Sequence, residues 1–165
     1  MNKRTASATS FQRAGALSNA QVGREFEAVA IEILQSEGLR LHHNYKLPVG
    51  IGKEKKAHVF DLGSDNPKTI VECKSHTWTK GNNVPSAKMT VWNEAMYYFA
   101  IASSSYRKIF FVLKDQRNSN QETLAEYYMR TYRHLIPEDV EIWEYDAGSS
   151  DVRVLTQSNS FGGPR

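Results

Sequence analysis

Two short segments of the chain carry side chains that could act together in catalysis: His58-Val-Phe-Asp61 and Ile70-Val-Glu72-Cys-Lys74. Successive side chains of a β-strand point to opposite faces, so Glu72 and Lys74 are expected on the same face of their strand. Asp61 stands near the end of the preceding predicted strand, and the short turn between the strands can place it opposite Glu72. The pattern therefore predicts that two carboxylates and one ammonium group meet at one end of a sheet.

The chemistry of this group favours a divalent cation. Ile70, Val71 and Cys73 are apolar residues that mark the second segment as a core strand, where charged groups must be paired, hydrated or bound to a metal. Two close carboxylates repel, so without a cation one of them should hold its proton more tightly. Ligands that are all oxygen suit Mg²⁺, with Mn²⁺ as a substitute, better than zinc. The alternative is an ion-pair ladder on the surface of a hairpin.

Glu27 is a third candidate acid, and it comes from a predicted helix. Glu25 and Glu32 belong to the polar face of that helix, whereas Glu27 is spaced three and four residues from Ala30 and Ile31. Glu27 therefore lies in the apolar stripe that should face the sheet. A place near the metal explains a carboxylate there, and a salt bridge to a buried lysine or arginine is the alternative.

Capping and turn signals predict one α/β domain with a mixed central sheet flanked by helices. Residues 18–156 are expected to form this domain, between a flexible basic arm at 1–17 and a flexible tail at 157–165. Ser18 and Gln21 read as a capping box for the first helix, which Gly38 ends. The predicted elements are a helix to about 37, strands at 40–47, 56–62 and 69–75, a helix at 86–102, a strand at 108–113, a helix to about 135 capped by Ser119 and Glu122, and strands at 140–145 and 152–155.

These residues resemble the PD-(D/E)XK nuclease superfamily, which contains restriction endonucleases and Holliday-junction resolvases. Asp61, ten intervening residues and then Glu72-Cys73-Lys74 resemble its metal motif, with Phe60 at the place of the motif's proline. Gly23-Arg-Glu-Phe-Glu27 is similar to the first helix of the resolvases. The αβββαβ order up to residue 113 is similar to the restriction endonuclease-like core, so the resemblance covers about residues 19–114.

The resemblance implies a Mg²⁺-dependent endonuclease that hydrolyses phosphodiester bonds in DNA. Asp61, Glu72, Glu27 and the backbone carbonyl of Cys73 would be the metal ligands. Lys74 would orient or help to deprotonate the attacking water and offset the charge on the phosphate. The enzyme could be of the restriction type or could act on a DNA structure, as resolvases and repair nucleases do. A non-catalytic nucleic-acid-binding module on a nuclease fold is the alternative, and a protein-interaction factor is a third interpretation.

The polar loop over residues 76–88 follows the motif directly and mixes a tryptophan with lysines and amides, which can stack on bases and bind phosphates. His76, Lys80 and Lys88 are the candidate nucleic-acid contacts of this loop. Asn93 is a further candidate, because Asn93 and Tyr97 form a loose version of the Gln-x-x-x-Tyr helix of some family members. The alternatives are an ordinary connection between strand and helix, a surface histidine, and a tyrosine packed in the core.

Composition is consistent with one folded domain. The chain has 165 residues, of which 40% are hydrophobic, and its single cysteine excludes an internal disulfide and fits a cytoplasmic location. No apolar run approaches the ~20 residues of a membrane span, so no membrane partner is expected. The partner is expected to be double-stranded or branched DNA, and a homodimer is expected because two cuts in a duplex usually need two active sites. Basic side chains that suit a phosphate backbone occur in two groups: Lys3, Arg4, Arg13 and Arg24, and Lys53, Lys55 and Lys56.

Overall fold

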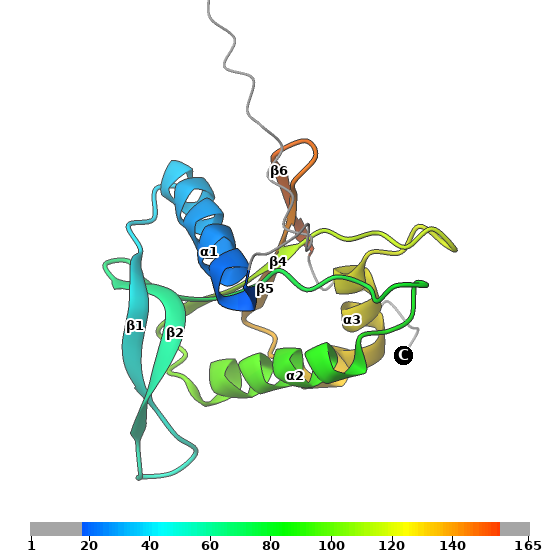
Figure 1. The fold of residues 1–165 in the computed structure, drawn as a ribbon. Helices are drawn as coiled ribbons and strands as arrows, with labels where there is room; N and C mark the ends of the chain where they lie inside the picture. Colours follow the sequence, from blue (N-terminus) through cyan, green and yellow to red (C-terminus); the bar gives the residue numbers. More distant parts are fainter. Residues whose placement is uncertain (1–17, 156–165) are drawn as a thin grey trace, which may run out of the picture.

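A six-stranded mixed sheet organises residues 18–155, which are the part of the chain that this computed structural model describes. The strands follow one another across the sheet in chain order, and Figure 1 shows the first two as a hairpin at one end of the molecule. Pairing is antiparallel for the first three strands, parallel from the third to the fifth, and antiparallel again for the last. The strands are β1 (His42–Val49), β2 (Lys56–Asp65), β3 (Lys68–Lys74), β4 (Arg107–Leu113), β5 (Val140–Asp146) and β6 (Asp151–Leu155).

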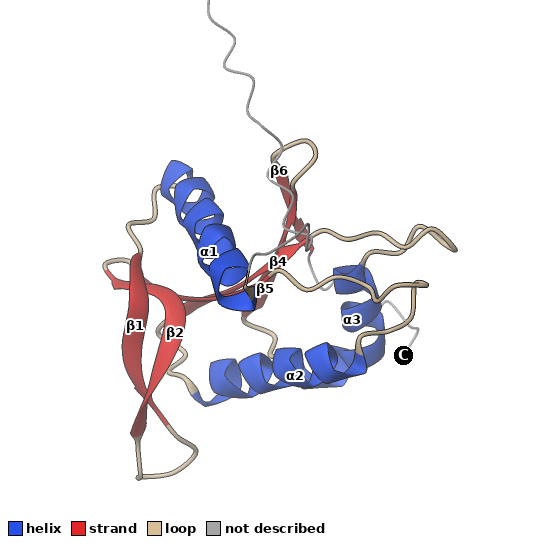
Figure 2. Ribbon diagram, in the orientation of Figure 1, coloured by secondary structure: helices blue, strands red, loops and turns tan. Residues whose placement is uncertain are grey.

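Helices cover both faces of this sheet, as the separate layers of Figure 2 show. The helix α1 (Asn19–Ser36) lies on one face, and α2 (Ser86–Ile101) and α3 (Leu124–Tyr132), which a short 3-10 turn (Arg133–Leu135) extends, lie on the other. Each face has its own hydrophobic core. The predicted α/β class with a mixed, helix-flanked sheet is confirmed, and the order of elements up to Leu113 is α-β-β-β-α-β as expected.

The strand β4 illustrates why the two cores share one sheet. Ile109 and Phe111 pack in the core under α1, whereas Phe110 and Val112 pack in the core under α2 and α3. Alternate side chains point to opposite faces, so a strand that is covered on both sides must be apolar at nearly every position. The nearly continuous apolar sequence of this segment follows from that burial.

The side chains of β2 switch from one face of the sheet to the other at Asp61, in the middle of the β1–β2 hairpin. Phe60 packs in the core under α2 and Leu62 in the core under α1, although regular alternation would place both on one side. Cross-strand pairing is interrupted at this point, because Asn44 and Asp61 are absent from the ladder and Asn44 has a positive φ of 54°. The hairpin therefore twists strongly next to the residue that the sequence singles out for chemistry.

Glycine is needed beside this twist. A Cβ atom at Gly63 would overlap the ring of Tyr45, which lies against the glycine from the neighbouring strand. The Tyr45 hydroxyl reaches the hydroxyl of Tyr106 at 2.9 Å and donates to Asp65, so two hydrogen bonds hold the end of the ring. These contacts hold β1 against β2 next to the twist.

The start of α3 differs from the prediction. Ser119 and Glu122 do not cap it; Thr123 is the N-cap, and its hydroxyl accepts from the backbone of Glu126 while that glutamate bonds back to the backbone of Thr123. The side chain of Glu122 is held by two arginines instead, one of which is Arg117. Two capping signatures overlap in the sequence, and these ion pairs favour the later one.

The other boundaries agree to within a few residues. Ser18 caps α1 by accepting from the backbone of Gln21, but the Gln21 side chain donates to Glu25, so only half of the expected capping box forms. Gly38 follows the helix with a φ of 85°, as the stop signal predicted. The arm at 1–17 and the tail at 157–165 lie outside the described residues. None of the helices within residues 18–155 is long and apolar enough to cross a membrane.

Candidate functional site

Asp61, Glu72 and Lys74 meet at the point where β2 separates from β3. Backbone pairing of the two strands ends at Leu62 and Val71, one residue short of the two acids. The Lys74 Nζ donates to Glu72 Oε2 at 2.7 Å and lies 3.3 Å from Asp61 Oδ2. The convergence that strand alternation predicted for these three side chains is thus present.

Asp61 takes the place of a backbone acceptor as the strands part. The backbone N–H of Cys73 donates to Asp61 Oδ2 at 2.7 Å. The pKa of Asp61 is raised to about 6. Burial is the largest cause, the charges of Glu72 and Glu27 add to the rise, and Lys74 and the Cys73 hydrogen bond oppose it. One carboxyl group of the pair therefore holds its proton more tightly than usual, as expected, but burial contributes more to this than the repulsion between the two acids on which the expectation rested.

Glu72 is the more deeply buried acid, with 6% of its surface exposed. Burial alone would raise its pKa, but the pKa is lowered because His58 Nε2 lies 3.3 Å from Oε1 and Lys74 bonds the other oxygen. The His58 ring stacks on Tyr98 with the ring centres 3.6 Å apart. Sequence reasoning assigned no role to His58, because only the twist of the hairpin brings it to Glu72.

Glu27 reaches the same region from α1 but is engaged elsewhere. Its Oε2 lies 3.3 Å from Nδ1 of His43 on β1, and its side chain is 25% exposed. The charge of Glu27 contributes to the raised pKa of Asp61, so the two acids are within electrostatic reach. The structure thus places Glu27 beside the site, with a histidine as its partner rather than the lysine or arginine of the alternative interpretation.

The side chains alone do not form a closed metal cage. Within residues 18–155, no group of three or more histidine, cysteine, aspartate or glutamate side chains is placed to hold a metal ion. Asp61 and Glu72 supply two carboxylates, and the Cys73 backbone supplies a carbonyl oxygen on the residue between Glu72 and Lys74. An oxygen-only set with room for water fits Mg²⁺ or Mn²⁺, which usually keep several waters when proteins bind them.

An open groove of about 910 Å³ begins at Cys73 and Lys74 and follows the loop after β3. His76, Lys80 and Lys88 line it, so three of the four predicted nucleic-acid contacts share one surface. The start of α1, the start of α2 and the segment at 115–118 complete its walls. This groove, which we call the lysine groove, meets the three-residue site at Lys74; Asp61 and Glu72 do not line it.

Asn93 is not among the residues that line the lysine groove. Its Oδ1 accepts from the hydroxyl of Tyr128 at 2.9 Å, which ties α2 to α3. Tyr97, the other residue of the loose helix motif, is 51% exposed and does not pack in the core as the alternative proposed. In the structure Asn93 therefore joins two helices and does not face the groove.

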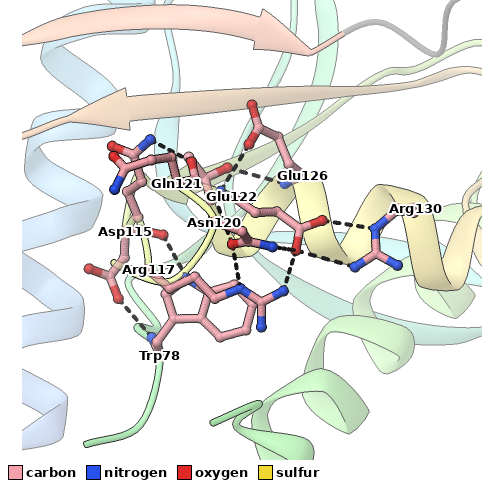
Figure 3. Close-up of polar contacts among 10 residues, drawn as sticks. Trp78, Asp115, Arg117, Asn120, Gln121, Glu122, Glu126 and Arg130 are labelled. Atoms are coloured by element: carbon pink, nitrogen blue, oxygen red, sulfur yellow. Dashed lines mark hydrogen bonds and ion pairs between the residues drawn. The ribbon is translucent and has the colours of Figure 1, made fainter. Parts of the chain in front are cut away.

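Trp78 holds the outer wall of the groove in place and offers no free ring face. Its backbone N–H donates to Asp115 Oδ2 at 2.7 Å, and its indole N–H donates to the Asp115 backbone carbonyl at 3.0 Å. The Arg117 guanidinium lies 4.4 Å above the ring (Figure 3), and the residue is only 7% exposed. The idea that this loop tryptophan stacks on bases is therefore wrong for the structure described here.

The turn that carries Arg117 is itself rigidly braced. Arg117 bonds Asn120 at 2.8 Å and also the carboxylate of Glu122, which Arg130 of α3 holds from the other side at 2.8 Å (Figure 3). The turn between β4 and α3 therefore presents a fixed surface to Trp78. Two loops that are distant in sequence are joined into one wall of the lysine groove.

Comparison with models of protein families, with curated proteins and with solved structures found no match to this chain. The convergence of Asp61, Glu72 and Lys74 and the adjoining lysine groove are therefore the observations from which a function is inferred. Together they offer two carboxylates of different proton affinity, a charged lysine, and a basic path that leads away from them.

Proposed function

We propose that this protein is a metal-dependent nuclease of the PD-(D/E)XK type that hydrolyses phosphodiester bonds in DNA. The observation that carries the proposal is the meeting of Asp61, Glu72 and Lys74 where two antiparallel strands separate. The α-β-β-β-α-β order, in which an antiparallel meander is followed by a parallel strand, supports the same family. A surface ion-pair ladder is less consistent with Glu72, which is almost fully buried.

Asp61 and Glu72 would hold the metal ion together with the carbonyl of Cys73. Their fit to Mg²⁺ rests on the donor set, which is all oxygen, and on the burial of Asp61, which raises its pKa and disfavours a carboxylate charge that a divalent cation would stabilise. When bound, the ion would supply Lewis-acid stabilisation of the phosphate charge. Glu27 would reach the metal ion from α1, either directly or through a water molecule.

Lys74 would act as a fixed positive charge. Burial lowers its pKa, but the carboxylates of Glu72 and Asp61 raise it by more, so the net pKa lies above the usual range. A lysine that stays protonated cannot take a proton from water. We therefore assign it the roles of orienting the attacking water and offsetting the charge that develops on the phosphate.

The test is a cleavage panel of linear, supercoiled, single-stranded and branched DNA with Mg²⁺ or Mn²⁺ and with EDTA. We expect cleavage that EDTA stops and that Lys74→Met abolishes. Lys108→Met is the matched control. Lys108 is also buried and forms an ion pair with Asp139 at 2.6 Å, but it lies at the start of β4, whereas Lys74 pairs with the end of that strand. Equal cleavage by wild type and Lys74→Met would refute the proposal.

The same panel separates the remaining alternatives. Discrete fragments from plasmid DNA would indicate a restriction-type enzyme, and a preference for branched substrates would indicate a structure-specific one. Binding to DNA without any cleavage in either metal would favour a non-catalytic module. Sedimentation of the protein with and without duplex DNA would test the proposed homodimer.

A further inference from the structure

His76 lies in the wall of the lysine groove, and one of its ring nitrogens accepts a hydrogen bond from a side chain of the core. The indole N–H of Trp92 donates to His76 Nδ1 at 2.8 Å. An indole nitrogen can only donate, so Nδ1 must act as the acceptor and carries no proton. A neutral histidine ring with an unprotonated Nδ1 has its proton on Nε2.

The core holds Trp92 so that this hydrogen bond is fixed. Trp92 is fully buried, and its ring makes edge contacts with Phe110 and Tyr128 at centroid distances of 5.1 and 5.0 Å. A large ring that is packed on all sides does not rotate to release its partner. The tautomer of His76 is therefore set by the packing of α2 against the sheet.

The surroundings of His76 also disfavour its charged form. Burial comes first, followed by the positive charges of Lys88 from α2 and Lys74 from β3, and together they lower the pKa of His76 to about 4. No acidic side chain contributes to the shift. The ring is thus neutral in the neutral pH range, within electrostatic reach of two ammonium groups.

The other edge of the ring is available for a ligand. Nδ1 and Nε2 lie on different edges of an imidazole, so the edge opposite the Trp92 contact carries the Nε2–H. Within residues 18–155 no hydrogen-bond partner of this nitrogen is present, and His76 lines the lysine groove. This N–H is free to donate into the groove, and the positive charges of Lys74 and Lys88 favour an acceptor with negative charge.

We propose that His76 binds a phosphate oxygen of a DNA strand in the lysine groove through Nε2–H, as a neutral donor in the groove that Lys74 and Lys88 also line. The identity of the ligand rests on the proposed nuclease function; the state of the ring does not. His76 is then a substrate-binding residue. It is neither a general base nor a metal ligand, because both roles need a lone pair on Nε2 and the only lone pair of the neutral ring points at Trp92.

The state of the ring can be tested without any enzymatic activity. Long-range ¹H–¹⁵N NMR of the full-length protein at neutral pH in EDTA distinguishes the two neutral tautomers and the charged ring. We expect His76 to be protonated on Nε2 alone, and its Nε2 resonance to shift when single-stranded DNA of 12 nucleotides is added. A proton on Nδ1, or an Nε2 signal that saturating DNA leaves unmoved, would overturn the inference.

Substitutions then test the contact itself, by fluorescence anisotropy of the same labelled strand in EDTA. His76→Asn removes the donor from the groove edge and should weaken binding by about tenfold, as expected for a hydrogen bond to a charged group. His76→Gln can place an amide N–H near the position of Nε2 and should restore part of the affinity. His134→Gln, a change of the same type at an exposed residue of the 3-10 turn, is the control and should bind like wild type.

The outcomes separate this inference from the proposed function. If the wild type cleaves DNA and His76→Asn binds DNA as well as the wild type does, the His76 contact is refuted and the nuclease proposal is not. Weakened binding by His76→Asn in a protein that never cleaves DNA would support the contact and reject the nuclease. Equal loss in His76→Asn and His76→Gln, with the circular dichroism spectrum of each unchanged, would count against a donor role.

Discussion

Replacing Asp61 by asparagine removes one charge from the site and keeps an oxygen that can accept from the backbone of Cys73. The pKa of Asp61 is raised from 3.8 to about 6, with burial as the largest cause. At ~1.36 kcal/mol per pKa unit, the ionised carboxylate opposes folding by ~3 kcal/mol above pH 7. Asp61→Asn should therefore raise the free energy of unfolding in EDTA at pH 8, by up to that amount, while it abolishes Mg²⁺-dependent cleavage.

The sign of the pH dependence follows from which state binds the proton. The folded protein holds the Asp61 proton more tightly than the unfolded chain does, so Asp61 lowers stability as pH rises from 3.8 through about 6. The imidazole of His76 acts in the opposite direction, because its pKa is lowered to about 4 and the unfolded chain binds that proton first. The informative quantity is therefore the difference between wild type and Asp61→Asn at each pH.

Urea denaturation at pH 8, 6 and 4.5 measures this difference. The advantage of Asp61→Asn should be ~3 kcal/mol at most at pH 8 and should shrink steadily toward pH 4.5. Adding Mg²⁺ at 100 times its dissociation constant should stabilise wild type by ~2.7 kcal/mol and leave the variant unchanged. A variant that is less stable than wild type in EDTA at pH 8, or an advantage that does not depend on pH, would refute the reasoning.

Three further predictions concern the elements around the site. Gly63→Ala should lower the free energy of unfolding by ~1–3 kcal/mol in urea titrations, because the new Cβ would overlap the ring of Tyr45; wild-type stability would show that the ring can move. Thr123→Ala should cost ~1 kcal/mol in the same assay and Ser119→Ala almost nothing, since only Thr123 caps α3; equal losses would contradict that assignment. The last prediction concerns three exposed lysines in the β1–β2 turn and at the start of β2: Lys53, Lys55 and Lys56. Replacing all three by glutamine should make the affinity for duplex DNA less dependent on salt. In a plot of log affinity against log salt concentration, the slope should become shallower by about 0.9 for each DNA phosphate that these lysines neutralise. An unchanged slope would show that the hairpin does not touch DNA.

Much of the site could be predicted from the sequence because the relevant rule is local. Strand alternation places Glu72 and Lys74 on one face of β3 in any fold. The short turn between β2 and β3 then brings Asp61 beside them. The α/β class and the order of elements also follow from local signals, such as the residues at which α1 begins and ends. The boundaries of α1 agree closely with these signals, whereas the competing cap signals before α3 led to a wrong start for that helix.

Predictions that depended on long-range packing were less complete. The sequence identified Glu27 as an acid in an apolar stripe, but its contact with His43 requires α1 to lie across β1. The sequence predicts that Trp78 is available for stacking, but Asp115 and Arg117, almost forty residues further along the chain, cover it. Periodicity contains no information about which distant side chain occupies a given place.

The sequence by itself determined the chemical types that can meet on β3, the oxygen ligands they offer to a cation, and the helices and strands that carry them. Only the tertiary structure decided the protonation of the site. The twist of the hairpin brings His58 to Glu72, and the packing of Trp92 selects the Nδ1 acceptor form of His76. The reason is physical: proton affinities depend on burial and on neighbours in space, and both exist only after the chain has folded.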